Sequence, residues 1–314
     1  MGFSATNTPG KISFHLKNAP YFSLLALLLF GLIFSNCVIY SLKQKHYKPV
    51  VLVHGILTNY TTITDLADRI REVHPGTEVY ITNQYGGLYS LEPLWRQVKY
   101  IGDEIMQICA INPDGIHLIG YSQGGLIARG ILEKFPYHNV QNFISLSSPQ
   151  AGEYGTKFLH IFYPNQALRE AYELFYSHMG QFISVGNYWN DPFHQELYYK
   201  YSQFLPYINN EVEGYRDEDY KRGITKLRRM VLIGGPDDGV IAPWQSSQFG
   251  FYADNDTDTV EDMRDRDIYK QDLFGLRTLD DEGKLTLYSV AGVTHSNWHR
   301  NLSVIDNYIM PWLS

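Results

Sequence analysis

The chain has 314 residues, of which 44% are hydrophobic and 19% charged, a composition typical of one decorated globular domain and not of a disordered chain. Its formal net charge is -7 and its Lys and Arg residues are scattered, so nucleic-acid binding is excluded as the main function and no nucleic-acid partner is expected. Of the two cysteines, Cys37 lies in the apolar N-terminal run and only Cys109 lies in the rest of the chain. The part of the chain after that run is therefore expected to form no internal disulfide.

The N-terminus carries a long apolar stretch. From Tyr21 to Leu42 the chain has no charged residue, and Lys11 and Lys17 precede this run. About 20 apolar residues span a bilayer as a helix, and basic residues ahead of such a run are typical of a signal peptide or a signal anchor. A buried core helix, the alternative, normally keeps a polar face. We therefore predict a signal peptide or signal anchor over residues 1–44, with membrane association through Tyr21–Leu42 if it is retained, and a lumenal domain over 45–314.

Three Asn-x-Ser/Thr triplets agree with a lumenal chain. They begin at Asn59, Asn255 and Asn301. One such triplet is a weak signal, because triplets of this kind arise often by chance. We predict these three residues as candidate glycosylation sites.

From about Tyr47 onward, short apolar runs alternate with amphipathic stretches, a rhythm typical of β-α units on a mostly parallel sheet. Strands are expected over 49–53, 78–82, 116–121, 140–146, 229–233 and 285–290. Helices are expected over 63–73, 92–109 and 124–135, where apolar residues recur at helical spacing.

About 80 residues between the fourth and fifth strands lack this rhythm. The region, roughly 147–227, is dense in Tyr and Phe, and we predict an inserted cap that packs on the main core. Two interpretations of its rings stay open: they only pack, or they line an apolar ligand pocket.

The strongest local motif is Gly120-Tyr121-Ser122-Gln123-Gly124, between a predicted strand and a predicted helix. A nucleophile on a sharp strand-to-helix turn needs small residues two positions before and after it, so that the backbone folds without clashes. The N-terminus of the following helix favours the negative charge that develops in acyl transfer. We predict Ser122 as the nucleophile of a serine hydrolase with the α/β-hydrolase fold.

A serine hydroxyl needs a base, and in this fold an acid follows a later strand and a His follows the last one. Among 11 histidines, His295 follows the last strand, whereas His299 is expected inside a terminal helix as a surface or packing residue. Asp237 and Asp238 both follow the fifth strand. Asp238, directly before Gly239, is the preferred acid, and Asp237 stays open as the alternative.

The oxyanion hole needs two backbone amides, one from the residue after the nucleophile and one from the loop after the first strand. These are Gln123 and Ile56, with His54-Gly55 as the tight turn that aims Ile56; His54 is expected to shape the loop and not to react. No zinc motif, Cys/His cluster, P-loop or dinucleotide loop is present, so no metal or cofactor is expected.

Several specific segments occur in a fixed order: Val53-His54-Gly55, His74-Pro75-Gly76-Thr77, Pro93-Leu94-Trp95, His117-Leu118-Ile119, Tyr121-Ser122-Gln123-Gly124-Gly125, Phe143 to Gln150, Asn187-Tyr188-Trp189, Val231 to Gly239 and Pro243 to Ser247. On these the chain resembles the palmitoyl-protein thioesterase family, most closely its lysosomal branch. The resemblance implies a lysosomal enzyme that hydrolyses long-chain S-acyl thioesters, acyl-CoA included, with Ser122, Asp238 and His295 as the triad.

Two rival functions stay open from the sequence. A lipid oxyester lipase or esterase would use the same three residues, and a catalytically silent member would bind lipids or partners in the cap. The chain length of the acyl group, the thiol carrier and the oligomeric state do not follow from the residues, nor does the choice between lysosomal residence, membrane anchoring and secretion.

Overall fold

The central sheet consists of short apolar strands, of which the four inner ones are almost completely buried and the two edge strands are partly exposed. The structure, a computed structural model, describes Phe30 and residues 47–314. All strand pairs of the six-stranded sheet are parallel, in the order β2-β1-β3-β4-β5-β8. The strands are β1 (Val50–Val53), β2 (Val79–Ile81), β3 (Ile116–Tyr121), β4 (Val140–Leu146), β5 (Arg229–Gly234) and β8 (Leu285–Ser289). This architecture confirms the predicted α/β fold.

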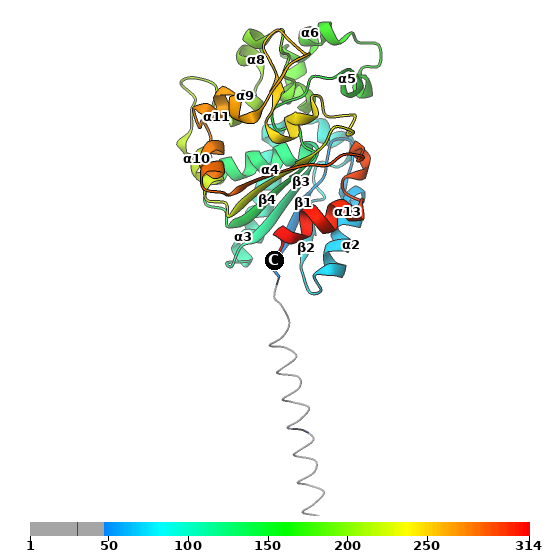
Figure 1. Cartoon of the computed structure of the whole chain (residues 1–314), viewed down its shortest axis with the longest axis vertical. Coiled ribbons are helices and arrows are strands. Elements are labelled where there is room, and N and C mark those ends of the chain that lie inside the picture. The colour runs from blue at the N-terminus through cyan, green and yellow to red at the C-terminus, as the bar shows by residue number, and fades with distance from the viewer. Residues whose placement is uncertain (1–29, 31–46) are drawn as a thin grey trace, which may run out of the picture. The chain divides into compact units, whose positions relative to one another are not determined.

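Helices cover both faces of this sheet (Figure 1). Successive strand residues point to opposite faces, so Val51 and Val53 join one apolar cluster, whereas Val50 and Leu52 join the other. The first cluster includes residues of α3 (Leu94–Ile111), α4 (Gln123–Lys134) and α10 (Glu218–Thr225). The second includes residues of α2 (Thr64–Val73), α13 (Leu302–Val304) and the C-terminal turns η8 (Ile305–Ile309) and η9 (Met310–Trp312).

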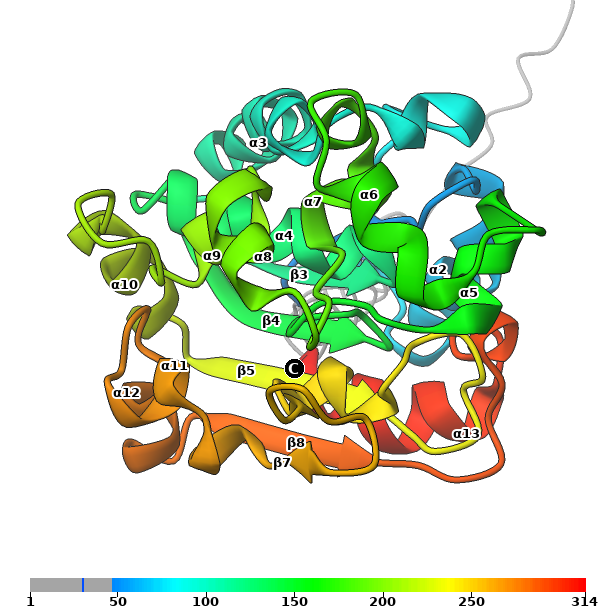
Figure 2. The same cartoon turned by 90° about the horizontal axis from the view of Figure 1, so that it is seen from above.

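Short helices fill the region between β4 and β5 where the sequence predicts a cap. They are α5 (Thr156–Phe162), η3 (Leu168–Glu170), α6 (Ala171–Phe175), η4 (Gly180–Phe182), α7 (Ser184–Tyr188), α8 (Gln195–Tyr201) and α9 (Leu205–Ile208), followed by α10. Many rings of this region, among them Phe175, Trp189 and Phe204, are fully buried in the same cluster as the sheet residues. Figure 2 looks down on α5 to α9, which lie over the sheet.

Several short elements were not predicted from the sequence. Between β5 and β8 they are η5 (Trp244–Gln248), the antiparallel pair β6 (Phe251–Tyr252) and β7 (Val260–Glu261), η6 (Met263–Asp265), α11 (Asp267–Lys270) and α12 (Leu276–Asp281). Elsewhere they are η1 (Tyr60–Ile63), η2 (Gly87–Leu91) and η7 (His295–Asn297). Elements of two to six residues are too short to show a period in the sequence.

The predicted apolar segment Tyr21–Leu42 lies, except for Phe30, outside the described residues. Among the residues that the structure does describe, no helix has both the length and the apolar character that crossing a membrane requires.

Candidate active site

Ser122 stands on a strained turn between β3 and α4. Its backbone has φ 54° and ψ -130°, and it directly precedes the first residue of the helix. The flanking glycines are required by close backbone contacts: a Cβ on Gly120 would lie 2.4 Å from the carbonyl oxygen of Gly124, and a Cβ on Gly124 would lie 2.3 Å from that of Val53. The motif therefore forms the sharp turn that a nucleophile needs.

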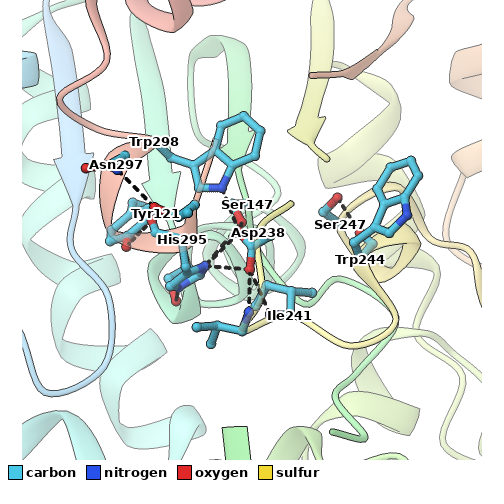
Figure 3. A network of polar contacts seen from close by, with 12 residues as sticks. Tyr121, Ser147, Asp238, Ile241, Trp244, Ser247, His295, Asn297 and Trp298 are labelled. Carbon is cyan, nitrogen blue, oxygen red and sulfur yellow. Dashed lines mark hydrogen bonds and ion pairs between the residues drawn. The ribbon is translucent and has the colours of Figure 1, made fainter. Parts of the chain in front are cut away.

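Three side chains far apart in the sequence meet at the carboxyl end of the sheet. Nε2 of His295 lies 2.9 Å from Oγ of Ser122, and Nδ1 of His295 lies 2.9 Å from Oδ2 of Asp238. Ser122 follows β3, Asp238 follows β5 and His295 follows β8, so parallel strands deliver all three to one edge. Figure 3 shows the imidazole directed at the Asp238 carboxylate.

The carboxylate of Asp238 is buried and richly hydrogen-bonded. Besides His295, it accepts hydrogen bonds from the Ser147 hydroxyl, from Nε1 of Trp298 at 2.6 Å and from the amides of Val240 at 3.0 Å and Ile241 at 2.8 Å (Figure 3). Burial raises the pKa of this carboxyl, but the hydrogen bonds and charge of His295, with those from Ser147 and Ile241, bring the pKa below its usual value. The group is therefore a fixed anion that holds the imidazole in one orientation.

The neighbouring Asp237 has a different partner. It is exposed, and its Oδ2 accepts a hydrogen bond of 2.7 Å from the amide of Gly292, in the loop that leads to His295. The geometry thus places Asp238, and not Asp237, against the imidazole.

The loop after Asp238 is held by a buried carboxyl group that the sequence did not single out. Glu153 is 0% exposed, and its two oxygens lie 3.1 and 3.2 Å from the amide nitrogen of Ala242, which donates to them. Burial raises the pKa of Glu153 well above its usual value, and the nearby charge of Asp238 adds to the rise, although the amide of Ala242 opposes it. Glu153 therefore anchors the loop from Asp238 to Ala242.

The amides predicted for the oxyanion hole lie beside Ser122. Gln123 is the first residue of α4, so its amide has no partner within the helix. A Cβ on Gly55 would lie 3.0 Å from the Cβ of Ser122, which brings the loop containing Ile56 against the nucleophile. In the described part of the chain, no hydrogen bond from the amide of Ile56 is present. The amides of Ile56 and Gln123 stay the predicted donors of the oxyanion hole.

Two further histidines occupy structural positions. The ring nitrogens of His54 lie 2.9 Å from the carbonyl oxygen of Gly55 and 3.1 Å from that of Gln84, so His54 ties two loops together. His299 is 1% exposed and packs edge-on against Tyr121. It lies in a turn between η7 and α13, so its predicted place inside a terminal helix is wrong; the helix begins only at Leu302, after the cap residue Asn301.

Sequence reasoning missed three contacts of the triad. Trp298 and Ser147 donate to Asp238, and the Tyr121 hydroxyl donates to the carbonyl oxygen of His295 at 2.8 Å. The contact of Ser147 could have been predicted from the sequence, since Ser147 is the first residue after β4 and the carboxyl ends of parallel strands share one edge of the sheet. The contacts of Trp298 and Tyr121 could not have been predicted, because they depend on how the loop around His295 folds back.

The candidate glycosylation residues Asn59 and Asn255 are exposed, and Asn301 is partly buried. Asn59 and Asn301 use their side-chain carbonyl oxygen to cap short helical turns. Glycosylation at the three positions stays a prediction.

This arrangement has the parts for acyl transfer: a hydroxyl, a base within hydrogen-bond distance of it, a fixed anion behind the base, and backbone amides at the start of a helix. In the described residues, no group of side chains is arranged to hold a metal ion.

Comparison with known proteins adds the following. The family model of palmitoyl protein thioesterase matches residues 49–295. The lysosomal thioesterase PPT2 homolog of Drosophila melanogaster is 49% identical over 267 residues, which cover 85% of this chain and 92% of the relative. The lysosomal thioesterase PPT2 of Homo sapiens is 44% identical over 272 residues, which cover 86% and 89%. Among solved structures, the mature lipase BlEst2 of Bacillus licheniformis has a TM-score of 0.46 at 16% identity and covers 85% of this chain and 92% of its own.

Proposed function

Because the chain belongs to the palmitoyl protein thioesterase family, we propose that it hydrolyses long-chain fatty acyl thioesters to the free fatty acid and a thiol. The observation that carries the proposal is the 2.9 Å contact between Nε2 of His295 and Oγ of Ser122, with Asp238 on the other side of the ring. The relatives reported above are lysosomal thioesterases, which supports a lysosomal location for this chain.

In the first half-reaction, Oγ of Ser122 attacks the carbonyl carbon of the thioester while its proton passes to Nε2 of His295. Asp238 stabilises the imidazolium that results. The amides of Ile56 and Gln123 donate hydrogen bonds to the oxyanion, and the N-terminus of α4 adds favourable electrostatics.

The tetrahedral intermediate then collapses with cleavage of the carbon-sulfur bond. The sulfur takes the electron pair, and the imidazolium of His295 supplies a proton to the departing thiolate. A thiol with an unperturbed pKa of about 8.5 leaves far more readily than an alkoxide, so little acid assistance is required. The product is an ester between the acyl group and Ser122.

In the second half-reaction, a water molecule gives a proton to His295 and attacks the acyl carbon. The bond to Oγ of Ser122 breaks, the fatty acid departs and Ser122 regains its proton from His295. The same imidazole is therefore the base in both halves, and the kinetics are ping-pong.

A side-by-side assay tests the choice of substrate. The purified chain is given palmitoyl-CoA and a palmitoyl oxyester of matched solubility, with Ser122→Ala as the control. We expect faster turnover of the thioester and loss of both activities in Ser122→Ala. Preference for the oxyester would support a lipase or esterase instead, and full thioester turnover by Ser122→Ala would refute the mechanism.

A further inference from the structure

A cavity of about 710 Å³ lies beside the loop that carries Asp238. Its floor includes Gly239 to Pro243, the residues that directly follow Asp238, and its other walls come from the cap and from the β6-β7 hairpin. Figure 2 shows α5 and the loop after β5 at the same end of the sheet, and Figure 3 shows Ile241 next to Asp238. Neither Ser122 nor His295 lines the cavity, so it is separate from the reacting groups.

The charged residues that line this cavity, in the part of the chain that the structure describes, are Lys157 and Arg169, and no Asp or Glu is among them. This is notable in a chain with a net charge of -7. Within residues 47–314 neither cation forms a hydrogen bond or an ion pair. Lys157 is directed over the loop, since a Cβ on Gly239 would lie 3.5 Å from its Nζ. Two such cations attract an anion, and a guanidinium is suited to the oxygens of a phosphate group.

The cavity is also lined by the aromatic side chains of Tyr154, Phe193, Trp244 and Tyr252 and by aliphatic ones, among them Leu168, Val240 and Ile241. The Tyr154 ring has its centroid 6.2 Å from that of Phe193 and 6.3 Å from that of Tyr252. Tyr154 is 2% exposed and supports the other rings, whereas Phe193, Trp244 and Tyr252 are exposed or partly exposed and offer ring faces on which a planar heterocycle stacks. A fatty acyl chain would gain nothing from two cations, whose desolvation is unfavourable in an apolar complex.

We propose that this cavity binds the leaving half of a CoA-type thioester, with Lys157 and Arg169 pairing with its phosphate oxygens and the aromatic rings contacting its purine. This inference rests on the proposed function and names the side chains that recognise the thiol carrier. The pantetheine arm between thiol and phosphates is long and flexible, so these side chains act at a distance from Ser122. Binding energy gained there holds the thioester at the nucleophile.

The test compares two thioesters with the same acyl group. One is palmitoyl-CoA, kept below its critical micelle concentration; the other is the palmitoyl thioester of N-acetylcysteamine, which has the thiol end but neither phosphates nor purine. In the double variant Lys157→Gln/Arg169→Gln we expect kcat/KM for palmitoyl-CoA to fall by about 10- to 100-fold, chiefly through KM, because two charge-assisted contacts are lost. Hydrolysis of the truncated thioester should stay within about twofold, since no contact with it is removed.

A matched control removes the same two charges elsewhere on the surface. Lys200→Gln/Arg222→Gln alters exposed side chains that do not line the cavity and should keep wild-type kinetics on both substrates. A loss in this control equal to that in the cavity variant would mean that net charge alone attracts the substrate, and would overturn the proposal.

A binding measurement separates this inference from the proposed function. Adenosine 3′,5′-bisphosphate, titrated calorimetrically, should bind the wild-type chain and bind the Lys157→Gln/Arg169→Gln variant at least tenfold more weakly. If the chain hydrolyses no thioester, the proposed function fails, and this titration still decides whether the cavity takes the nucleotide. Nucleotide binding with an unchanged kcat/KM for palmitoyl-CoA would assign the cavity to a free nucleotide and overturn the leaving-group assignment, as would an equal loss on both thioesters.

Discussion

Replacing Asp238 by Asn should abolish most of the catalytic rate, and the neighbouring Asp237 provides a matched control. The two carboxylate oxygens of Asp238 face the Nδ1 of His295, the Ser147 hydroxyl, the Trp298 indole and two backbone amides. An Asn side chain turns one of these two acceptors into a donor, so in either orientation its NH₂ group faces protein donors.

The magnitude follows from the contact with His295. If the Asn NH₂ group points at Nδ1, the imidazole carries its proton on Nε2 and cannot take the proton of Ser122. A wrong tautomer of this kind lowers kcat by about 10⁴-fold in a serine hydrolase triad, or roughly 5.5 kcal/mol of barrier. The mismatched donors should also lower the free energy of unfolding by about 1 to 3 kcal/mol.

The assay measures kcat on palmitoyl-CoA for Asp238→Asn and for Asp237→Asn, with thermal unfolding as a check that each variant folds. The Asp237 carboxylate is exposed and accepts from the amide of Gly292, so Asp237→Asn should keep kcat within about threefold, as surface substitutions usually have small effects. Retention of more than a tenth of the activity by folded Asp238→Asn, or an equal loss in Asp237→Asn, would refute the assignment of the acid.

Three further changes have expected outcomes. Burial raises the pKa of Glu133 to about 8 although Arg129 opposes the rise, so the folded state favours the protonated carboxyl and stability is lost as the pH rises above about 4.5. Glu133→Gln should therefore match the wild type in urea unfolding at pH 4 and be more stable than it at pH 7.5; equal stability at both pH values would contradict this. Ser147→Ala removes a hydrogen bond that helps to depress the pKa of Asp238. On acidification, kcat/KM of this variant should therefore fall at a higher pH than kcat/KM of the wild type. An acid limb of the pH profile at the wild-type position would count against this role. Gly124→Ala places a Cβ 2.3 Å from a carbonyl oxygen of β1 and should cost about 3 kcal/mol or more, which chemical denaturation would detect; wild-type stability would show that the turn relaxes freely.

The fold was largely predictable because its strands are continuous apolar runs. β3 and β4 begin and end at the predicted residues, since glycine, proline or a polar turn bounds each run. The β6-β7 hairpin was not predicted, because strands of two residues depend on tertiary contacts and show no pattern of their own.

The candidate site was also predictable only in part. The order of Ser122, Asp238 and His295 along parallel strands predicted which residues could meet, and the structure brings them within hydrogen-bond distance. The sequence favoured Asp238 but left Asp237 open, because both residues lie in the turn after β5. The choice depends on which carboxylate points at His295 and which points at Gly292, and the folded loops determine that.

The most direct measurement is the mass of the protein during turnover. Rapid quenching of the wild-type chain with palmitoyl-CoA, followed by peptide mass spectrometry, should show a palmitoyl adduct on the peptide that contains Ser122 and none in Ser122→Ala. A chain that turns over palmitoyl-CoA with no adduct at Ser122, and equally well after Ser122→Ala, would contradict the account.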